Sequence, residues 1–434
     1  MTDQTRAGLR PGWRTGWRTG WRTGLVAMAT LFAIAACAPD EDAADAAAEA
    51  EDLGELRLGA LMPMTGDLQA YGETSLNGVQ LAVRQINDQG GVNGREVVIE
   101  VGDTQTAPQP GIDAAQQLVN VFGAHAVIGA LSSGVTIPVA QSVTREEGVL
   151  QISPASTSPV ITDLDDDDFL FRTVPSDAFQ GLALSELVVE DGLEGVSILY
   201  INNDYGEGLA ESFTASFEAS GGNVVATQAY DDGAGSYRGE LSSVASDDAE
   251  ALVLIGYPEN GITILRQALE GGHFDRFVFT DGLKSPDIID SVGAEALEGS
   301  FGSVPQAPEG SEAAELYAAA YDDAYGERPP QPFIDTAYDA AFVVALAAQA
   351  AGSRDRETIR DHLREVANAP GEEILPGEWS KAVDLLEAGE DIQYSGASGS
   401  IEFDENGDVA GSFAHWVIEG GAIRTVRVFE PELD

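Results

Sequence analysis

The sequence has little cysteine, lysine or histidine: one cysteine, two lysines and four histidines occur in 434 residues. A single cysteine excludes an intrachain disulfide, so packing alone must hold the fold together. Positive charge is scarce as well, because 22 Lys and Arg residues stand against 73 Asp and Glu residues, a formal net charge of −51. So acidic a chain repels phosphates and anionic lipid headgroups, which excludes nucleic acid as a partner and argues against adsorption to membranes through basic patches.

Signatures of catalysis and of metal binding are also missing. The sequence has no phosphate-binding loop and no G-x-S-x-G motif, and its first apolar strand leads into a turn without the glycine spacing of a dinucleotide site. The histidines at 125, 273, 362 and 415 lack metal-ligand spacing. The acidic run 163–168 lacks the EF-hand pattern and is typical of a solvated loop. We therefore expect no cofactor, no metal and no enzymatic activity.

The one cysteine, Cys37, ends a segment typical of a secretory signal. Five arginines precede an apolar run over 25–36, which is too short to span a bilayer. The sequence Ile-Ala-Ala-Cys at 34–37 resembles a lipobox, in which the cysteine receives a diacylglyceryl group and becomes the new N-terminus. We expect residues 1–36 to be a lipoprotein signal peptide and Cys37 to be the lipid attachment site. The alternative is an ordinary signal peptide with an incidental cysteine.

Residues 37–55 are predicted to be an acidic tether. The segment consists mainly of alanine, aspartate and glutamate, carries eight acidic residues and cannot bury a core. Its charges repel one another and extend the chain. It would hold the folded body, with 17 basic and 64 acidic residues from Leu56 onward, away from the membrane surface.

From Leu56 onward, short apolar runs alternate with stretches of helical periodicity. Repeated βα units predict parallel sheets with helices on both faces, and there are too many units for one sheet. We therefore expect an α/β protein with two doubly wound parallel-sheet lobes. The expected strands are 56–61, 96–101, 126–129, 149–152, 196–201, 223–227, 251–255, 277–280, 399–403, 412–418 and 423–429, with helices dominating 311–369.

The return to strands at the C-terminal end predicts that the chain passes between the lobes more than once. We expect lobe one to comprise residues 56–174 and 306–395, and lobe two residues 175–305 and 396–434. The lobes would be joined by a multi-strand hinge, with crossings near 174–175, 304–305 and 395–399.

Several segments together carry a resemblance to a known family. Over residues 56–430 the chain resembles the periplasmic leucine/isoleucine/valine-binding proteins, the extracellular solute receptors of ABC importers. The resemblance implies a type I periplasmic-binding-protein fold, a monomer located outside the cytoplasm, and the importer's permease subunits as partners. Its segments are 66–72 (GDLQAYG), 90–94 (GGVNG), 127–129 (VIG) with 132–133 (SS), 151–157 (QISPAST), 172–173 (RT), 204–208 (DYGEG), 256–257 (GY) and 280–282 (TDG).

In lobe one, the resemblance implies a half-site for the carboxylate of an amino acid. The matching positions are Ser133, Ala155 and Thr157. Hydroxyls and backbone N–H groups at helix starts suit an anion. The alternative is that the serines and threonine of these loops only cap the helices that follow.

In lobe two, the resemblance implies a half-site for the ammonium. Asp281 matches the acidic residue of the family, in which glutamate is common, so the shorter aspartate is a departure. Tyr257 and Tyr205 in lobe two and Tyr71 in lobe one would wall the cleft and present π faces to a cation.

One half-site on each lobe predicts closure of the hinge around a zwitterion. The expected ligand is a neutral amino acid, with a branched or other aliphatic side chain. A binding protein or sensor for urea, a short amide or an aromatic acid is the alternative, because the pocket for the ligand's side chain is not visible in the sequence. An enzyme with this two-lobed fold is a more distant alternative.

Overall fold

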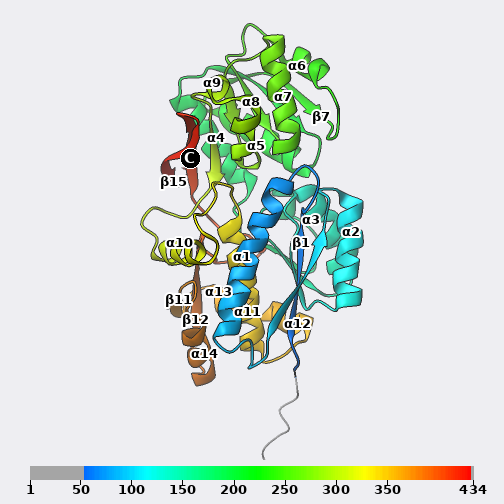
Figure 1. Cartoon of the computed structure of the whole chain (residues 1–434), viewed down its shortest axis with the longest axis vertical. Coiled ribbons are helices and arrows are strands. Elements are labelled where there is room, and N and C mark those ends of the chain that lie inside the picture. The colour runs from blue at the N-terminus through cyan, green and yellow to red at the C-terminus, as the bar shows by residue number, and fades with distance from the viewer. Residues whose placement is uncertain (1–52, 432–434) are drawn as a thin grey trace, which may run out of the picture. The chain divides into compact units, whose positions relative to one another are not determined.

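The computed structural model describes residues 53–431, which form three β-sheets and the helices around them (Figure 1). The expected signal peptide, Cys37 and almost all of the tether lie outside the described residues. Within 53–431, no helix has both the length and the apolar character needed to cross a membrane.

The first sheet has five parallel strands in the order β2-β1-β3-β4-β5. The inner strands β3 and β4 are buried at every residue, which explains their nearly continuous apolar sequence. Strand β5 was not predicted. The bounds are β1 (Leu56–Met62), β2 (Val97–Asp103), β3 (Ala126–Gly129), β4 (Leu150–Ser153) and β5 (Leu170–Arg172), with helices α1 (Gln69–Asp88), α2 (Pro108–Gln117) and α3 (Ser133–Val139) between them.

The second sheet has seven strands in the order β15-β14-β10-β9-β8-β6-β7. Its first five strands along the chain are parallel, and an antiparallel hairpin, β14–β15, extends the edge at β10. The hairpin turns at Gly420 and Gly421, with φ of +61° and +80°, values that favour glycine. The strands are β6 (Gly195–Ile201), β7 (Asn223–Tyr230), β8 (Ala251–Ile255), β9 (Phe277–Phe279), β10 (Phe301–Pro305), β14 (Phe413–Glu419) and β15 (Ala422–Phe429).

Helices lie between the strands of the second sheet, and further helices lie in the stretch of chain between β10 and β14. Those of the second lobe are α4 (Asp177–Glu190), α5 (Asp204–Ala219), α6 (Arg238–Val244), α7 (Pro258–Gly271), α8 (Pro286–Val292) and α9 (Ala294–Leu297). After β10 come α10 (Glu312–Tyr325), α11 (Ile334–Ala351), α12 (Arg356–Asp361), α13 (Leu363–Ala367) and α14 (Trp379–Ala388), with the small sheet of β11 (Glu372–Ile374), β12 (Ile392–Gly396) and β13 (Gly399–Ser400). The α/β architecture with two parallel-sheet lobes is thus confirmed.

Helix α11 is central to the first lobe because it packs along α1 and is buried over most of its length. The two helices approach closely at Gly78, where a Cβ atom would lie 2.1 Å from the carbonyl oxygen of Ile334. This contact requires glycine. Helix α11 thereby joins the stretch after β10 to the first lobe.

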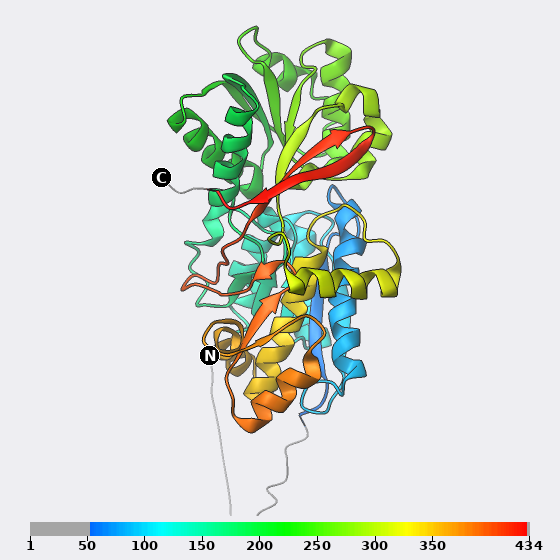
Figure 2. The same ribbon diagram turned by 90° about the vertical axis from the view of Figure 1, so that its left-hand side faces the viewer.

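The chain passes between the two sheets three times, after β5, after β10 and before β14. The third passage lies later than the expected 395–399, because that stretch forms the β12–β13 hairpin. Asp408 still binds Arg172 at the end of β5, so the passage to β14 falls at 409–412. Figure 2 shows the C-terminal hairpin β14–β15, in red, lying on the second sheet while the orange strands stay with the first lobe.

The acidic run 163–168 is largely exposed, as expected of a solvated loop, but several of its carboxylates form ion pairs. Asp165 and Asp167 pair with Arg145, and Asp168 binds Arg364 through both carboxylate oxygens. The run therefore ties the loop before β5 to α13. In the part of the chain described, no group of three or more His, Cys, Asp or Glu side chains is arranged to hold a metal ion.

Asp339 of α11 is fully buried and holds the β12–β13 hairpin. Its carboxylate accepts hydrogen bonds from Tyr394 Oη at 2.7 Å, from the backbone N–H groups of Ala397 and Ser398 at 2.8 Å, and from Ser398 Oγ at 2.6 Å. We expect Asp339→Asn to lower the free energy of unfolding by about 1–3 kcal/mol, because the amide Nδ2 cannot accept from the donors it would face. Urea unfolding measures this loss.

The matched control for this prediction is Asp384→Asn on the exposed face of α14. It should change the free energy of unfolding by less than about 0.5 kcal/mol. Equal effects of the two substitutions would contradict the role given to Asp339.

Candidate ligand-binding cleft

The residues predicted to bind a ligand all follow strands of the two sheets. Ser133 begins α3 after β3, and Ala155 and Thr157 come after β4. In lobe two, Tyr205, Tyr257 and Asp281 follow β6, β8 and β9 in the same way, and Tyr71 lies in the first turn of α1 after β1. Carboxyl ends of parallel strands meet at one edge of a sheet, so each lobe gathers its loops at one edge.

A narrow cavity of about 10 Å³ lies where the loops of the two lobes meet. Six of the seven predicted ligand-binding residues line this cavity, and Thr157 does not. Its lining is Leu68, Tyr71, Leu131, Ser133 and Ala155 from lobe one, Tyr205, Tyr257, Asp281 and Gly282 from lobe two, and Phe333 before α11.

Thr157 is fully buried and turned toward the start of α4. Its hydroxyl donates to Asp177 Oδ2 at 2.8 Å, and its carbonyl oxygen accepts the backbone N–H of Asp177 at 2.7 Å. The hydroxyl hydrogen is therefore engaged by a carboxylate of the protein.

The lobe-one side of the cavity carries hydroxyl groups. Ser133 Oγ accepts the backbone N–H of Ser158 at 3.2 Å, which leaves its hydroxyl hydrogen to donate into the cavity that it lines. Ser132 precedes α3 but makes no capping hydrogen bond there, and its Oγ lies 3.0 Å from Tyr257 Oη across the cleft. For Ser132, the geometry therefore disfavours the alternative that the residue serves only as a helix cap.

The lobe-two side carries a buried carboxylate. Asp281 is 3% exposed, and its Oδ1 accepts from Tyr205 Oη and from Gln180 Nε2, both at 2.8 Å. Burial raises the pKa of the Asp281 carboxyl to about 6, and the two hydrogen bonds only partly offset this rise. The ring of Tyr205 stacks on that of Tyr257, with centroids 5.6 Å apart and an interplanar angle of 11°. The arrangement suits a cation that approaches Asp281 beside aromatic faces.

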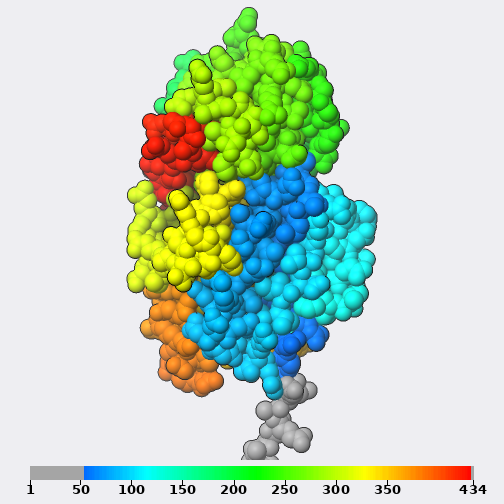
Figure 3. All heavy atoms as spheres, in the orientation of Figure 1, coloured from blue at the N-terminus to red at the C-terminus, as the bar shows by residue number. Residues whose placement is uncertain are grey.

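Hydrogen bonds join the lobes directly across the cleft. Tyr71 Oη donates to the carbonyl oxygens of Gly282 at 3.0 Å and Asp281 at 3.3 Å, and Asn260 Nδ2 donates to Asp67 Oδ2 at 2.9 Å. In the space-filling view the start of α1, in blue, touches the green second lobe (Figure 3). The cleft is thus closed around the cavity.

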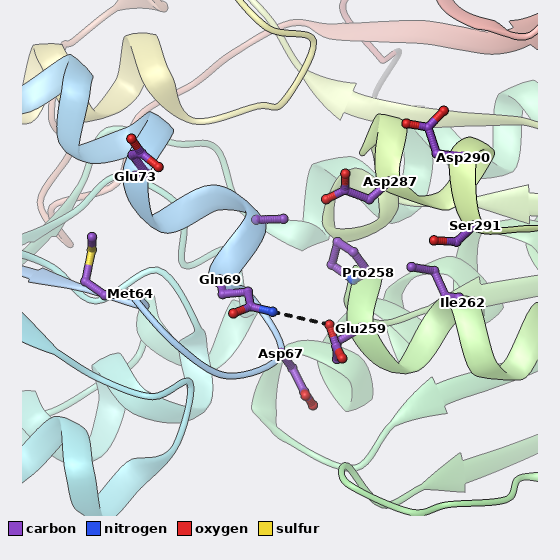
Figure 4. A pocket seen from close by; sticks show the side chains of 11 residues that line it. Met64, Asp67, Gln69, Glu73, Pro258, Glu259, Ile262, Asp287, Asp290 and Ser291 are labelled. Carbon is purple, nitrogen blue, oxygen red and sulfur yellow. Dashed lines mark hydrogen bonds between the residues drawn. The ribbon is translucent and has the colours of Figure 1, made fainter.

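An open groove lies on the outer side of the same cleft (Figure 4). Gln69 Nε2 reaches across it to Glu259 Oε2 at 3.4 Å. Five carboxylates and no basic side chain line it, which makes the rim attractive to cations and repellent to anions. The lining residues are Met64, Asp67, Gln69, Ala70, Glu73, Pro258, Glu259, Ile262, Asp287, Asp290 and Ser291.

Three apolar residues of the cavity were not predicted: Leu68, Leu131 and Phe333. Leu68 lies inside a segment that carries the family resemblance and Leu131 directly precedes another, so their closeness in sequence to Tyr71 and Ser133 was a usable signal. Phe333 gave no such sequence signal, because an isolated aromatic residue before a helix is typical of a hydrophobic core. Its φ of +70° is rare for a bulky residue, and its ring meets the edge of Tyr71 at 6.2 Å between centroids.

Two α/β lobes with a cavity between the carboxyl ends of their strands define a class of two-lobed proteins whose candidate site for a small solute lies in the cleft. The family described as periplasmic binding protein matches residues 55–381, and the chain belongs to it.

Relatives of known name support the resemblance to the Leu/Ile/Val-binding proteins. The Leu/Ile/Val-binding protein BraC3 of Rhizobium johnstonii is 30% identical over 318 residues, 73% of this chain and 85% of the relative. The Leu, Ile, Val, Thr and Ala-binding protein of Pseudomonas aeruginosa is 30% identical over 304 residues, 70% of this chain and 80% of the relative. The chemotactic signal transduction substrate-binding protein BasB of Halobacterium salinarum is 26% identical over 353 residues, 80% of this chain and 82% of the relative.

Solved structures agree with this assignment. The leucine-binding protein LivK of Thermotoga maritima superposes with a TM-score of 0.74 at 27% identity and covers 87% of this chain and 99% of its own. LivJ of Streptococcus pneumoniae, solved in complex with isoleucine, gives a TM-score of 0.72 at 25% identity and covers 87% of this chain and 100% of its own. The predicted family and the type I fold are thus confirmed.

Proposed function

We propose that the protein is the solute receptor of an ABC importer and binds a neutral amino acid with an aliphatic side chain. The observation that supports this proposal is the cavity itself, which is lined by the buried Asp281 of lobe two and by Ser133 of lobe one. No chemical change of the ligand is part of the proposal.

The two sides of the cavity match the two charges of a zwitterion. An ammonium taken out of water needs acceptors, which Asp281 supplies, and its positive charge is stabilised by the aromatic rings beside it. A carboxylate needs donors, which the hydroxyl of Ser133 can supply, together with the backbone N–H of Ala155, whose bond to Ser153 Oγ is long at 3.4 Å. A ligand that touches both lobes stabilises the closed form by its difference in affinity for the closed and open forms.

The apolar wall of Leu68, Leu131 and Phe333 supports an aliphatic side chain. The cavity is narrow in this closed form, and a site enclosed between two lobes suits a small ligand rather than a peptide. The relatives named after leucine, isoleucine and valine favour the same ligand class. The acidic groove outside the cleft disfavours ligands with net negative charge.

The place of the protein in the cell follows from residues 34–37. A lipobox there would attach acyl chains to Cys37 outside the cytoplasm, and the acidic segment 37–55 would link the folded body to the membrane. We propose that the receptor works as a lipid-anchored monomer that presents its closed form to the permease subunits.

A sensory role is the second candidate, favoured by the similarity to BasB, a chemotactic substrate-binding protein. The same cavity would then report the solute to a transducer instead of a permease. Deletion of the gene separates the two functions: loss of uptake of labelled leucine supports import, and loss of chemotaxis toward leucine with normal uptake supports sensing.

The experiment that tests the ligand class is a thermal-shift screen with amino acids, amides, urea and aromatic acids. A ligand present at 100 times its Kd stabilises the folded state by about 2.7 kcal/mol. We expect leucine, isoleucine or valine to raise the melting temperature most. Stabilisation by urea, amides or aromatic acids, with none by any amino acid, would contradict the zwitterion model.

A further inference from the structure

A second small cavity lies at the hinge. It measures about 20 Å³ and is lined by residues of all three passages between the lobes. Thr173 and Pro175 come from the first passage, Pro305 and Gln306 from the second, and residues 409–412 from the third. This hinge cavity therefore belongs to the joint between the lobes rather than to the core of either lobe.

Phe333 lies at the boundary between the hinge cavity and the ligand cavity. Among the described residues, it is the one that belongs to the lining of both. The residue is 5% exposed, and its ring meets that of Tyr71, which also lines the ligand cavity, at 6.2 Å between centroids. The two cavities thus meet at Phe333, whose side chain forms the partition between them.

The backbone of Phe333 holds the ring at this boundary. Its φ of +70° lies in the left-handed region, which a bulky residue adopts only where the surrounding structure enforces it. Phe333 immediately precedes α11, which is buried over most of its length and packs along α1. A backbone outlier of this kind beside a binding cavity points to a functional constraint on the ring.

The two cavities differ in chemistry. The ligand cavity has Leu68 and Leu131 in its lining, whereas several hydroxyl-bearing residues line the hinge cavity. One of these is Thr336 in the first turn of α11, which is 4% exposed and whose Oγ1 has no hydrogen-bond partner among the described residues. A hydroxyl both donates and accepts. Thr336 can therefore pair with an amide or hydroxyl group that enters the hinge cavity.

We propose that Phe333 sets the upper limit on the length of the ligand's side chain, and that the hinge cavity is a polar extension of the ligand site that the ring closes off. In the wild type the ring confines the side chain to the apolar wall, which suits aliphatic amino acids. Without the ring, the joined cavities would take amino acids with a longer side chain that ends in an amide, such as glutamine. This inference rests on the proposed amino-acid binding and adds a specificity-determining residue to it.

Titration calorimetry of the processed full chain with leucine, methionine and glutamine tests the partition. We expect the wild type to bind leucine best. Phe333→Ala should weaken the binding of leucine and strengthen that of methionine and glutamine, so that the preference for leucine over glutamine falls by about 10-fold or more. Phe333→Gly also removes the ring and suits a φ of +70°, so it provides the same test if the alanine variant folds poorly.

A second substitution tests the polar lining. Adding Thr336→Val to Phe333→Ala removes the hydroxyl and nearly keeps the volume, so it should abolish the gain for glutamine and keep the gain for methionine. Leu131→Ala is the matched control, because Leu131 lines the ligand cavity but not the hinge cavity. It should not shift the preference toward glutamine, and a shift equal to that of Phe333→Ala would contradict the partition.

The outcomes separate this inference from the proposed function. Variants without the ring that keep the wild-type preference for leucine over glutamine within about threefold overturn the inference and leave the proposed function standing. A gain for glutamine that Thr336→Val leaves unchanged overturns the polar extension. Failure of the wild type to bind leucine, isoleucine, valine or any other amino acid overturns both the inference and the proposed function.

Discussion

Asp281→Ala should weaken binding of the amino-acid ligand by about 2–5 kcal/mol, because it leaves a buried ammonium without its carboxylate. Asp281 is the acidic side chain that lines the cavity, and Tyr205 and Gln180 orient it through two hydrogen bonds of 2.8 Å. Titration calorimetry with leucine on the wild type and the variant measures the change.

The control for this prediction is Asp290→Ala in the outer groove, where the side chain is exposed. A charge at the rim acts through water and salt, so its loss should change affinity by less than about 1 kcal/mol. A loss well below about 1 kcal/mol for Asp281→Ala would mean that Asp281 is not the partner of the ammonium.

Arg172→Met should lower the free energy of unfolding by about 3–5 kcal/mol, because it leaves a partly buried carboxylate without its counter-ion. The Arg172 side chain is fully buried and binds both oxygens of Asp408, at 2.6 and 2.7 Å. It also donates to Ser158 O at 3.0 Å and to Thr162 Oγ1 at 2.8 Å, which fixes the loop after β4. Urea unfolding followed by circular dichroism measures the loss.

Two further variants test the origin of this effect. Arg276→Met breaks a pair with Asp191 in which both side chains are well exposed, so it should cost less than about 1 kcal/mol. Adding Asp408→Leu to Arg172→Met should restore part of the stability, because it removes the uncompensated charge. A double variant no more stable than Arg172→Met would show that lost packing, not the charge, causes the effect.

The sequence predicted the parallel strands well because buried parallel strands are short, continuous apolar runs. Strands β5 and β10 escaped prediction; β5 has three residues and ends in Arg172, a charged residue that its partners, Asp408 far along the chain among them, make tolerable in a core. The third passage between the lobes was placed too early for a similar reason. The contact that keeps 401–408 with the first lobe joins residues 236 positions apart.

The site was predictable where the family resemblance supplied positions, and not beyond them. The resemblance placed Ser133, Ala155 and Asp281 in loops, and the structure brings them to one cavity. The resemblance could not predict that the hydroxyl of Thr157 donates a hydrogen bond to Asp177. This bond depends on how the chain after β5 packs against the loop after β4. The apolar wall was invisible for a different reason: apolar residues at a site and in a core have the same sequence pattern.

The hydrogen bonds across the cleft, such as those from Tyr71 to Gly282 and between Ser132 and Tyr257, join protein to protein without any ligand atom. Each contributes about 0.5–1.5 kcal/mol, so part of the free energy that holds the cleft shut is the same for every solute. This shared contribution strengthens the capture of every solute that the cleft closes around equally and adds nothing to the choice among them. Under the proposed amino-acid binding, discrimination between leucine, valine and alanine would be left to the fit of one apolar wall, and the receptor would bind a group of amino acids rather than a single one.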